Sequence, residues 1–398
     1  MEAEHNKRKL RILEIVFKNP LSIPGGLEVY ALNISKEFLK HGHLVDFTFV
    51  EDEDLPVLKE YMLNGLDNKF NFIGFRISKV WNYLGLVKLV YSLKLRKFAK
   101  VNKNKYDILH INGDNGGLVC YKHSIPCVMT SHGDSKLAYL QCKGNIKGFV
   151  LKKYVYATHK ISYFLENFGY SNADKITVVS IPLLKLLEKK FNDRDIVYTP
   201  PSIDIEKAHK LEIDKFTLRK KEGYESKFYA LFIGKSPLKK GLKTAIQAVM
   251  GCKQFNLIAI TSGIEDNNKY AEKAKFLSNV SNEELNNLYN LCDLLVFPSA
   301  YEGLPTVVIE AMSCGLIPVV YGNIASNIPE IKNGINSFVV NSEKEFIDVL
   351  KHVELMQPEE IKNMSLNAVR SIEGNYSSVK LAETFLDIFY KISSDNKF

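Results

Sequence analysis

The 398-residue sequence lacks the patterns that mark several classes of protein. Its six cysteines, at positions 120, 127, 142, 252, 292 and 314, include no C-x-x-C pair and no histidine partner at zinc-site spacing, which favours dispersed reduced thiols. No window of about 18 uncharged apolar residues occurs. Glu2, Glu4 and Glu14 interrupt the N-terminal stretch where a signal peptide needs a basic and then an apolar run. We therefore expect a cytoplasmic protein without a membrane span or a metal site.

The composition is that of an ordinary folded protein, but its charge is uneven. Apolar residues make up 46% of the chain and charged residues 25%, which excludes disordered and fibrous classes. Residues 1–200 hold 30 basic and 20 acidic residues, whereas residues 201–398 hold 23 and 25. The surplus of positive charge in the first half indicates an anionic partner for that half, whether nucleic acid, a membrane surface or a phosphorylated substrate.

Short β-branched runs alternate with longer helical patterns, which predicts an α/β fold with mostly parallel sheets. The strands expected in the first half are Leu10–Phe17, Leu44–Val50, Asp107–Asn112, Pro126–Ser131 and Lys175–Ser180. Those expected in the second half are Tyr229–Gly234, Leu257–Thr261, Leu294–Pro298, Ile317–Tyr321 and Ser337–Val340. Between the two sets, the proline pair in Tyr198–Asp204 favours an extended connection. We therefore place domains at 1–200 and 201–373, followed by a C-terminal segment at 374–398.

Two doubly wound domains bind ligands outside the carboxyl ends of their strands, so the expected site is a cleft between the halves. The alternative is one large α/β domain without a cleft. Single domains above roughly 250–300 residues are uncommon, which favours two.

The segment Phe297–Gly315, FPSAYEGLPTVVIEAMSCG, is the most informative motif. It reads as a strand end, a loop, and a helix with Pro305 in its first turn and Gly315 at its stop. The free N–H groups and positive dipole end of that helix form an anion site. Glu302 precedes the helix and Glu310 lies one turn after Thr306, although a first-turn glutamate also serves simply to stabilise a helix dipole.

The spacing Glu302-x7-Glu310 within this motif resembles the signature of the family 4 retaining glycosyltransferases, which have the GT-B fold of two facing Rossmann-like domains. Phe276–Asp293 and Ile328–Gly334 resemble the segments that flank the motif in that family. The resemblance implies that Glu310 holds the donor ribose and that Glu302 lies near the hydroxyls of the transferred sugar. It also implies that the backbone of four residues lines the sugar and diphosphate: Gly303, Leu304, Pro305 and Thr306.

The resemblance extends to two glycine-containing loops that follow strands. In Phe232–Gly241 the family has Arg then Lys gripping the diphosphate; Lys240 matches the second, and Lys235 replaces the first. Lysine keeps the charge but loses the planar fork of arginine. From the residues alone, both lysines also fit an exposed loop. Gly25 and Gly26 resemble the family's first loop, facing the donor phosphates or the acceptor, and we expect them to allow close backbone approach and positive φ.

His132, in Met129–Asp134, follows a predicted strand. A histidine at a strand end is compatible with catalysis, although a lone histidine more often makes a structural hydrogen bond. Its place resembles that of the family histidine that contacts the transferred sugar. The neighbouring Asp134 has no such assignment.

The resemblance implies a same-face substitution in which the leaving diphosphate helps to deprotonate the acceptor hydroxyl. Lys235, Lys240 and the helix N-terminus would neutralise the leaving group. No cofactor is expected, and the expected donor substrate is a UDP- or GDP-sugar. The acidic run Glu51–Asp54 superficially resembles a metal motif, but it also fits a solvated loop, and GT-B enzymes do not generally need such a metal.

Residues 79–105 carry eight basic residues and no acidic one. Leu86, Leu89, Val90 and Leu93 form an i, i+3, i+4, i+7 stripe, which predicts a basic amphipathic helix. Such a helix lies at an anionic membrane surface or packs on its own domain with a lysine-rich outer face. A second acid-free basic stretch, Gln141–Lys160, favours a lipid-linked or phosphate-bearing acceptor.

The leading hypothesis is thus a hexosyltransferase of polysaccharide or glycolipid biosynthesis that acts on a glycan or lipid-linked acceptor. The resemblance makes 1–200 the acceptor domain, 201–373 the nucleotide-sugar domain, and 374–398, with a helix at Tyr376–Ile392, a return to the first domain. No nucleic-acid partner is expected. The alternatives are an epimerase or phosphorylase of the same architecture, and a catalytically silent scaffold that binds nucleotide sugar or an anionic surface.

Overall fold

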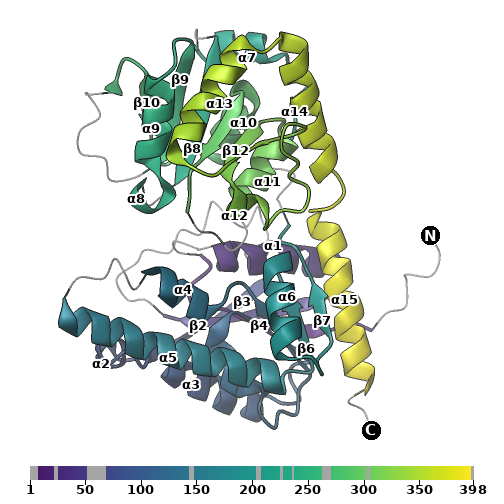
Figure 1. The fold of residues 1–398 in the computed structure, drawn as a ribbon. Coiled ribbons are helices and arrows are strands. Elements are labelled where there is room, and N and C mark those ends of the chain that lie inside the picture. The colour runs from purple at the N-terminus through teal and green to yellow at the C-terminus, as the bar shows by residue number, and fades with distance from the viewer. Residues whose placement is uncertain are drawn as a thin grey trace. The chain divides into compact units, whose positions relative to one another are not determined.

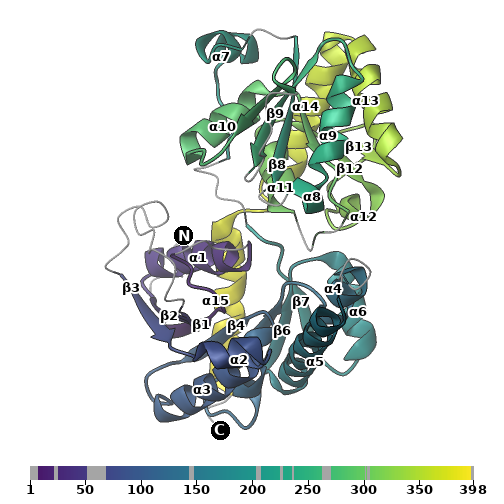
Figure 2. The same ribbon diagram turned by 90° about the vertical axis from the view of Figure 1, so that its left-hand side faces the viewer.

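The computed structural model describes residues 8–21, 26–51, 69–142, 148–202, 208–224, 227–234, 237–261, 270–300, 302 and 305–395. The chain forms two compact units (Figures 1 and 2). The first comprises Met1–Ser202 and Ser378–Phe398, and the second comprises Ile203–Ser377. Each unit is an α/β fold around one parallel sheet.

The sheet of the first unit has the order β3-β2-β1-β4-β5-β6-β7, with parallel pairing throughout. Its strands are β1 (Arg11–Ile15), β2 (Leu44–Val50), β3 (Phe70–Phe75), β4 (Ile108–Asn112), β5 (Cys127–Ser131), β6 (Lys175–Val178) and β7 (Ile196–Tyr198). Its helices are α1 (Gly26–Lys40), α2 (Lys79–Tyr83), α3 (Val87–Val101), the 3-10 helix η1 (Asp114–Cys120), α4 (Ser135–Cys142), α5 (Phe149–Asn172), α6 (Ile181–Lys190) and α15 (Ser378–Asp395).

The sheet of the second unit has the order β10-β9-β8-β11-β12-β13 and is likewise parallel. Its strands are β8 (Phe228–Gly234), β9 (Phe255–Thr261), β10 (Ala274–Leu277), β11 (Leu294–Phe297), β12 (Ile317–Tyr321) and β13 (Phe338–Val340). Its helices are α7 (Lys215–Lys221), α8 (Pro237–Lys240), α9 (Leu242–Met250), α10 (Asn282–Leu291), α11 (Thr306–Ser313), α12 (Gly322–Ala325), α13 (Glu343–Leu355) and α14 (Pro358–Ile372). In both sheets the strand order reverses beside the first strand, between β1 and β4 and between β8 and β11. Such a switch point leaves a crevice at the carboxyl edge of the sheet.

The predicted α/β class and all ten predicted strands are confirmed, with shifts of at most two residues at their ends. The prediction missed β3, β7 and β10, which lie at the outer edges of the two sheets.

The C-terminal helix α15 packs on α1 in the first unit, and both views show the two helices side by side (Figures 1 and 2). Phe385 and Phe389 of α15 are fully buried, and their rings contact Tyr30 and Phe38 of α1, respectively. This apolar contact makes α15 part of the core of the first unit although it is last in the sequence.

The predicted apolar stripe of α3 is wrong in its register. The residues that α3 buries are Tyr91, Ser92, Leu95 and Ala99, whereas Leu93 is 51% exposed. Tyr91 decides the register, because its hydroxyl donates to the Val16 carbonyl oxygen at 2.8 Å beneath the helix.

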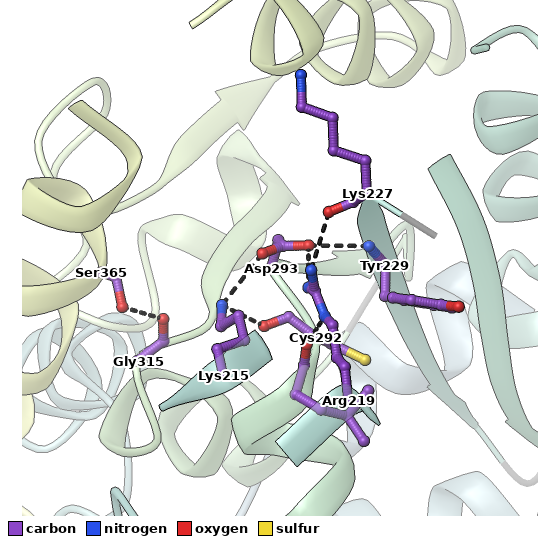
Figure 3. A network of polar contacts seen from close by, with 9 residues as sticks. Lys215, Arg219, Lys227, Tyr229, Cys292, Asp293, Gly315 and Ser365 are labelled. Atoms are coloured by element: carbon purple, nitrogen blue, oxygen red, sulfur yellow. Dashed lines mark hydrogen bonds and ion pairs between the residues drawn. The ribbon is translucent and has the colours of Figure 1, made fainter. Parts of the chain in front are cut away.

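A buried charged network fixes the amino-terminal edge of the second sheet (Figure 3). Asp293, at the start of β11, accepts from Arg219 Nη2 at 2.5 Å, from the Tyr229 backbone N–H at 2.8 Å and from Lys215 Nζ at 3.1 Å. Arg219 also donates to the carbonyl oxygens of Leu291 and Lys227, each at 2.8 Å. Since the Arg219 side chain is only 4% exposed, its charge depends on these partners. The network therefore holds α7 against β8 and β11.

Candidate active site

In the second unit, the structure brings Lys240 and Glu302 together at the carboxyl ends of the neighbouring strands β8 and β11. Lys240 Nζ forms an ion pair with Glu302 Oε1, which also accepts from Ser299 Oγ at 2.7 Å. The side chains of Lys240 and Glu302 are 30% and 17% exposed. Asn327 Nδ2 donates to the Glu302 carbonyl oxygen at 3.0 Å, so the backbone of Glu302 is fixed as well. A cation and a carboxylate thus lie at the switch point of this sheet, both partly accessible to a ligand.

Gly241 makes this approach possible. Its φ is +78°, and a Cβ atom added there would lie 2.4 Å from the carbonyl oxygen of Pro298. Only glycine therefore allows the turn after α8 to lie against the end of β11. Gly241 therefore allows the preceding residue, Lys240, to lie beside the loop that carries Glu302.

Helix α11 follows that loop, and its N-terminus lies on the carboxyl side of β11. Pro305 is the residue before the helix rather than part of its first turn as predicted, and Thr306 begins it. The stop at Gly315 is confirmed, because Gly315 has φ +85° just after the last helical turn. Glu310 Oε2 accepts from Tyr289 Oη at 2.9 Å. Burial and the nearby Glu310 carboxylate raise the pKa of Tyr289 well above its ordinary value, so the hydroxyl remains a donor that orients Glu310.

In the first unit, His132 is connected to a buried carboxylate. Glu14 of β1 is fully buried and accepts from Asn112 Nδ2 at 2.8 Å. Asn112, the last residue of β4, turns its Oδ1 toward His132 Nε2 at 3.1 Å. Glu14 also contacts His110 Nδ1 at 2.9 Å, and His110 Nε2 lies 2.7 Å from Thr130 Oγ1. Four residues of three adjacent strands, together with His132 in the loop after β5, therefore form one polar network.

This network fixes the tautomer of His132. A carboxylate only accepts hydrogen bonds, so the amide nitrogen of Asn112 must face Glu14 and its oxygen must face His132. His132 Nε2 therefore carries the proton. Burial, with a smaller contribution from His110, lowers the pKa of His132 to about 3, which keeps the ring neutral. Its Nδ1 then has a lone pair that can accept a hydrogen bond from a hydroxyl.

Tyr30 supports His132 from α1, with its ring 4.8 Å away in an edge-on arrangement. Gly26 is the first residue of α1, in helical geometry and not at the positive φ that we expected. Within the described part of the chain, a Cβ atom at Gly26 would meet nothing within 4 Å. The start of α1 thus borders open space at the carboxyl edge of β1.

Glu166, which no sequence motif indicated, holds the loop after His132. Glu166 Oε2 accepts from the Ser135 backbone N–H at 3.2 Å, and its Oε1 accepts from Tyr170 Oη at 3.1 Å. Burial raises the pKa of Glu166 to about 7. Asp134 has a structural role, because its Oδ1 accepts from the Leu137 backbone N–H at 2.7 Å at the start of α4.

Glu14 and Asn112 were also missed, and both had a weak signal: each is a polar residue inside an otherwise apolar strand. Other predicted site residues lie outside the described residues, namely Gly25, Lys235, Gly303 and Leu304. Of the acidic run Glu51–Asp54, only Glu51 is described, and it pairs with Arg76 Nε at 2.8 Å. Among the residues that the structure covers, no group of three or more His, Cys, Asp and Glu side chains could hold a metal ion.

Comparisons with known families cover both units. Residues 24–207 match the family described as Glycosyltransferase Family 4, and residues 213–370 match Glycosyl transferases group 1. The chain belongs to the family 4 glycosyltransferases. It is 24% identical over 371 residues to a D-inositol 3-phosphate glycosyltransferase of Geodermatophilus obscurus, covering 82% of this chain and 77% of the relative. It is also 30% identical over 108 residues, 27% of each protein, to an Escherichia coli UDP-Gal:alpha-D-GlcNAc-diphosphoundecaprenol alpha-1,3-galactosyltransferase.

Solved structures show that the fold of this glycosyltransferase is GT-B. A sucrose-phosphate synthase from Thermosynechococcus elongatus has a TM-score of 0.75 at 14% identity, covering 97% of this chain and all of that one. Anabaena HepE in complex with UDP-glucose has a TM-score of 0.69 at 16% identity, covering 96% and 100%. The expected family and fold are therefore confirmed. Among the described residues, no helix has both the length and the hydropathy that crossing a membrane requires.

Proposed function

We propose that this glycosyltransferase transfers a sugar, with retention of anomeric configuration, from a UDP- or GDP-sugar to a hydroxyl of a glycan or lipid-linked acceptor. The Lys240–Glu302 pair, at the switch point of the second sheet, is the observation that carries the proposal. A nucleotide-sugar diphosphate needs a cation beside its leaving oxygens, and a sugar needs a carboxylate to accept from its hydroxyls. The pair supplies both within one contact.

In this mechanism, the bond from the anomeric carbon to the diphosphate oxygen breaks while a bond to the acceptor oxygen forms on the same face. The acceptor proton passes to a diphosphate oxygen. Lys240 and the N-terminus of α11 stabilise the negative charge that develops on the diphosphate. Glu310, oriented by Tyr289, accepts from the ribose. In the first unit, neutral His132 offers Nδ1 as an acceptor for a sugar hydroxyl.

The relatives support the donor and acceptor classes. One solved neighbour is a complex with UDP-glucose, and one relative is named for a UDP-galactose donor and a diphosphoundecaprenol-linked acceptor. A UDP-sugar and a lipid-diphosphate acceptor are therefore the first pair to test. The competing hypothesis is a catalytically silent scaffold that binds the donor without transfer.

The test begins with a thermal-shift panel of UDP-, GDP- and ADP-sugars at one concentration. A ligand that binds only the native chain raises Tm by mass action. We expect one base class to raise Tm. Glu310→Gln should reduce that rise, because its amide oxygen accepts from Tyr289 Oη and its NH2 group, a donor, then replaces the acceptor oxygen that faces the ribose. The stabilising donor is then incubated with acceptor and the anomeric configuration of the product is determined by NMR. An inverted product contradicts retention, and binding without hydrolysis or transfer favours the scaffold.

We further propose that α2 and the adjacent part of α5 rest on an anionic membrane that presents the acceptor. Trp81 and Tyr83 of α2 are 39% and 80% exposed, beside the basic residues of 79–105. Tyr154 Oη of α5 donates to the Asn82 carbonyl oxygen at 2.7 Å, which holds the two helices together. Exposed Trp and Tyr beside lysines suit the headgroup region of a bilayer. At low salt, the wild-type protein should float with anionic vesicles and a W81S/Y83S variant should not. If the wild-type protein does not float with the vesicles, the membrane contact is contradicted.

A further inference from the structure

A cavity lies in the first unit, away from the candidate active site. It has a volume of about 510 Å³, within the range of small-molecule sites. The last turns of α3 and the segment from Tyr121 to Ile125, which leads into β5, form its walls. Both segments precede their strands, so the cavity opens at the amino-terminal edge of the sheet. His132 and the start of α1 lie at the opposite, carboxyl-terminal edge.

The walls of this cavity are basic. Arg96, Lys97 and Lys100 come from α3, and Lys122 and His123 come from the segment before β5. None of the four lysine and arginine side chains forms an ion pair with a carboxylate of the described residues. Clustered like charges without counter-charges repel each other, and an anion bound among them relieves that repulsion.

One carboxylate lies close to the cavity, and it is already engaged. His123 Nε2 is 3.4 Å from Asp174 Oδ2, and the same oxygen accepts from the Cys127 backbone N–H at 2.7 Å. Asp174 therefore holds the start of β5 and orients His123. It leaves the four stronger cations of the cavity without a neutralising group.

The ring of Tyr121 lies close to two of these cations. Its ring centroid lies 5.1 Å from Arg96 Cζ and 5.4 Å from Lys122 Nζ. Lys122 has φ +46°, a left-handed conformation that costs a lysine free energy and that glycine would adopt more easily. The chain thus carries a lysine at a position where the backbone favours glycine.

The floor of the cavity is apolar. Leu109, Val119 and Ile125 line it and are each at most 2% exposed. The exposed Ser124 adds a hydroxyl beside the cations. A basic wall over an apolar floor suits a ligand with an anionic head and a less polar body.

We propose that this cavity binds an organic phosphate monoester, separately from the donor sugar. Near neutral pH a monoester carries between one and two negative charges and three strong acceptor oxygens. Arg96 can contact two of those oxygens at once, while Lys100 and Lys122 act as point charges. A free metabolite and a lipid headgroup can both supply a phosphate monoester, and the experiment distinguishes them.

The test is titration calorimetry of the full chain with glycerol 3-phosphate. The wild type should bind one equivalent saturably, and an R96Q/K100Q variant should bind at least tenfold more weakly. The charge-matched control is K185Q/K189Q, which removes two exposed charges from α6 in the same unit and should stay within twofold of the wild type. Binding should also persist in a Lys240→Met chain, which separates this site from the donor site.

A second arm uses sedimentation with phosphatidylcholine vesicles that contain or lack phosphatidic acid. Calorimetric binding assigns the cavity to a free ester. Binding only to phosphatidic acid vesicles assigns it to a lipid headgroup, provided that R96Q/K100Q loses this binding and K185Q/K189Q keeps it. The proposal is overturned if the wild type binds neither probe, or if both double variants lose binding equally, which indicates diffuse attraction rather than a site. Because donor binding and turnover are measured separately, failure here leaves the proposed transferase activity unaffected.

Discussion

Replacing Lys240 with methionine removes the positive charge at the candidate donor site while keeping an unbranched side chain of similar length. In the structure, Lys240 Nζ pairs with Glu302 and lies 5.8 Å from the centroid of the Phe297 ring. Methionine retains an apolar contact with that ring but cannot pair with the carboxylate. Glu302 keeps its hydrogen bond from Ser299 Oγ.

The structural and catalytic costs of this change differ in size. Both side chains of the pair are partly exposed, so its loss should cost about 1 kcal/mol of folding stability or less. For a unit of the size of Ile203–Ser377 that lowers Tm by roughly 2–4 °C. Loss of a group that stabilises charge in the transition state costs about 10²–10³ in kcat, or roughly 3–4 kcal/mol. Catalysis should therefore fall far more than stability does.

The assay measures kcat, KM and Tm with the donor that the thermal-shift panel selects. The control is Lys243→Met on α9, an exposed lysine three residues further along, which should leave kcat within twofold of the wild type. The reasoning is refuted if Lys240→Met retains more than about one fifth of the wild-type kcat. It is refuted equally if Lys243→Met loses as much activity, since lysine charge in general would then explain the effect.

Three further changes test the networks around the two sheets. Asn112→Leu breaks the connection between Glu14 and His132. We expect about a tenfold loss of kcat/KM, because one hydrogen bond to a neutral group is lost. We also expect ¹⁵N NMR to show a mixture of His132 tautomers; a single tautomer contradicts the network. Asp293→Asn leaves the buried Arg219 guanidinium without its counter-charge and should cost about 3–5 kcal/mol in urea denaturation, while an unchanged midpoint argues against the network. Glu166 has a folded-state pKa of about 7 against an ordinary 4.5, so the wild type loses stability as the pH rises through that window. Glu166→Gln removes this loss: its stability relative to the wild type should improve between pH 5 and pH 8 by up to roughly 3 kcal/mol, and thermal unfolding at the two pH values measures it.

Nine of the ten strands that the sequence predicted are mostly buried within the parallel sheets. The tenth, β13, is an edge strand that was recognised because its three residues are all apolar. The three missed strands have a weaker pattern. β3 and β10 are only partly buried edge strands, and β7 has three residues that are all intermediate in exposure. At an edge, one neighbouring strand supplies the pairing, so the residues need not form a continuous apolar run. Each of them pairs with the strand that precedes it in the chain, which lies too far back for a local sequence pattern to show the pairing.

The register of α3 shows the same limit at a helix. Leucines and valines at helical spacing predicted a face containing Leu93, but the helix buries a face built on Tyr91 and Leu95. A hydrogen bond to the β1 end, together with Ser92 Oγ accepting from the Leu118 backbone N–H at 3.0 Å, selects that face. Polar partners supplied by other elements outweighed the apolar stripe.

The candidate site was predictable where its residues lie in loops with a recognisable pattern, as Lys240 and Glu302 do. Glu14 and Asn112 were not, because each is polar within a strand that otherwise reads as apolar core. Their contact with each other follows only from the strand order, which places β1 beside β4. A carboxylate buried there would be unfavourable alone, and it is tolerated because Asn112 and His110 donate to it.

The two sheets use the same topological feature for different tasks. At the β1–β4 switch point, a fully buried carboxylate orients an amide, which orients a neutral histidine at the edge. At the β8–β11 switch point, the carboxylate of Glu302 is partly exposed and pairs directly with a lysine. Burial explains the difference: a charge deep in the sheet can act only through its hydrogen-bond partners, whereas a charge in the loop after the strand can exchange its partner for a ligand. Substitution at Glu14 should therefore change how His132 is oriented without removing a ligand contact, and substitution at Glu302 should remove one.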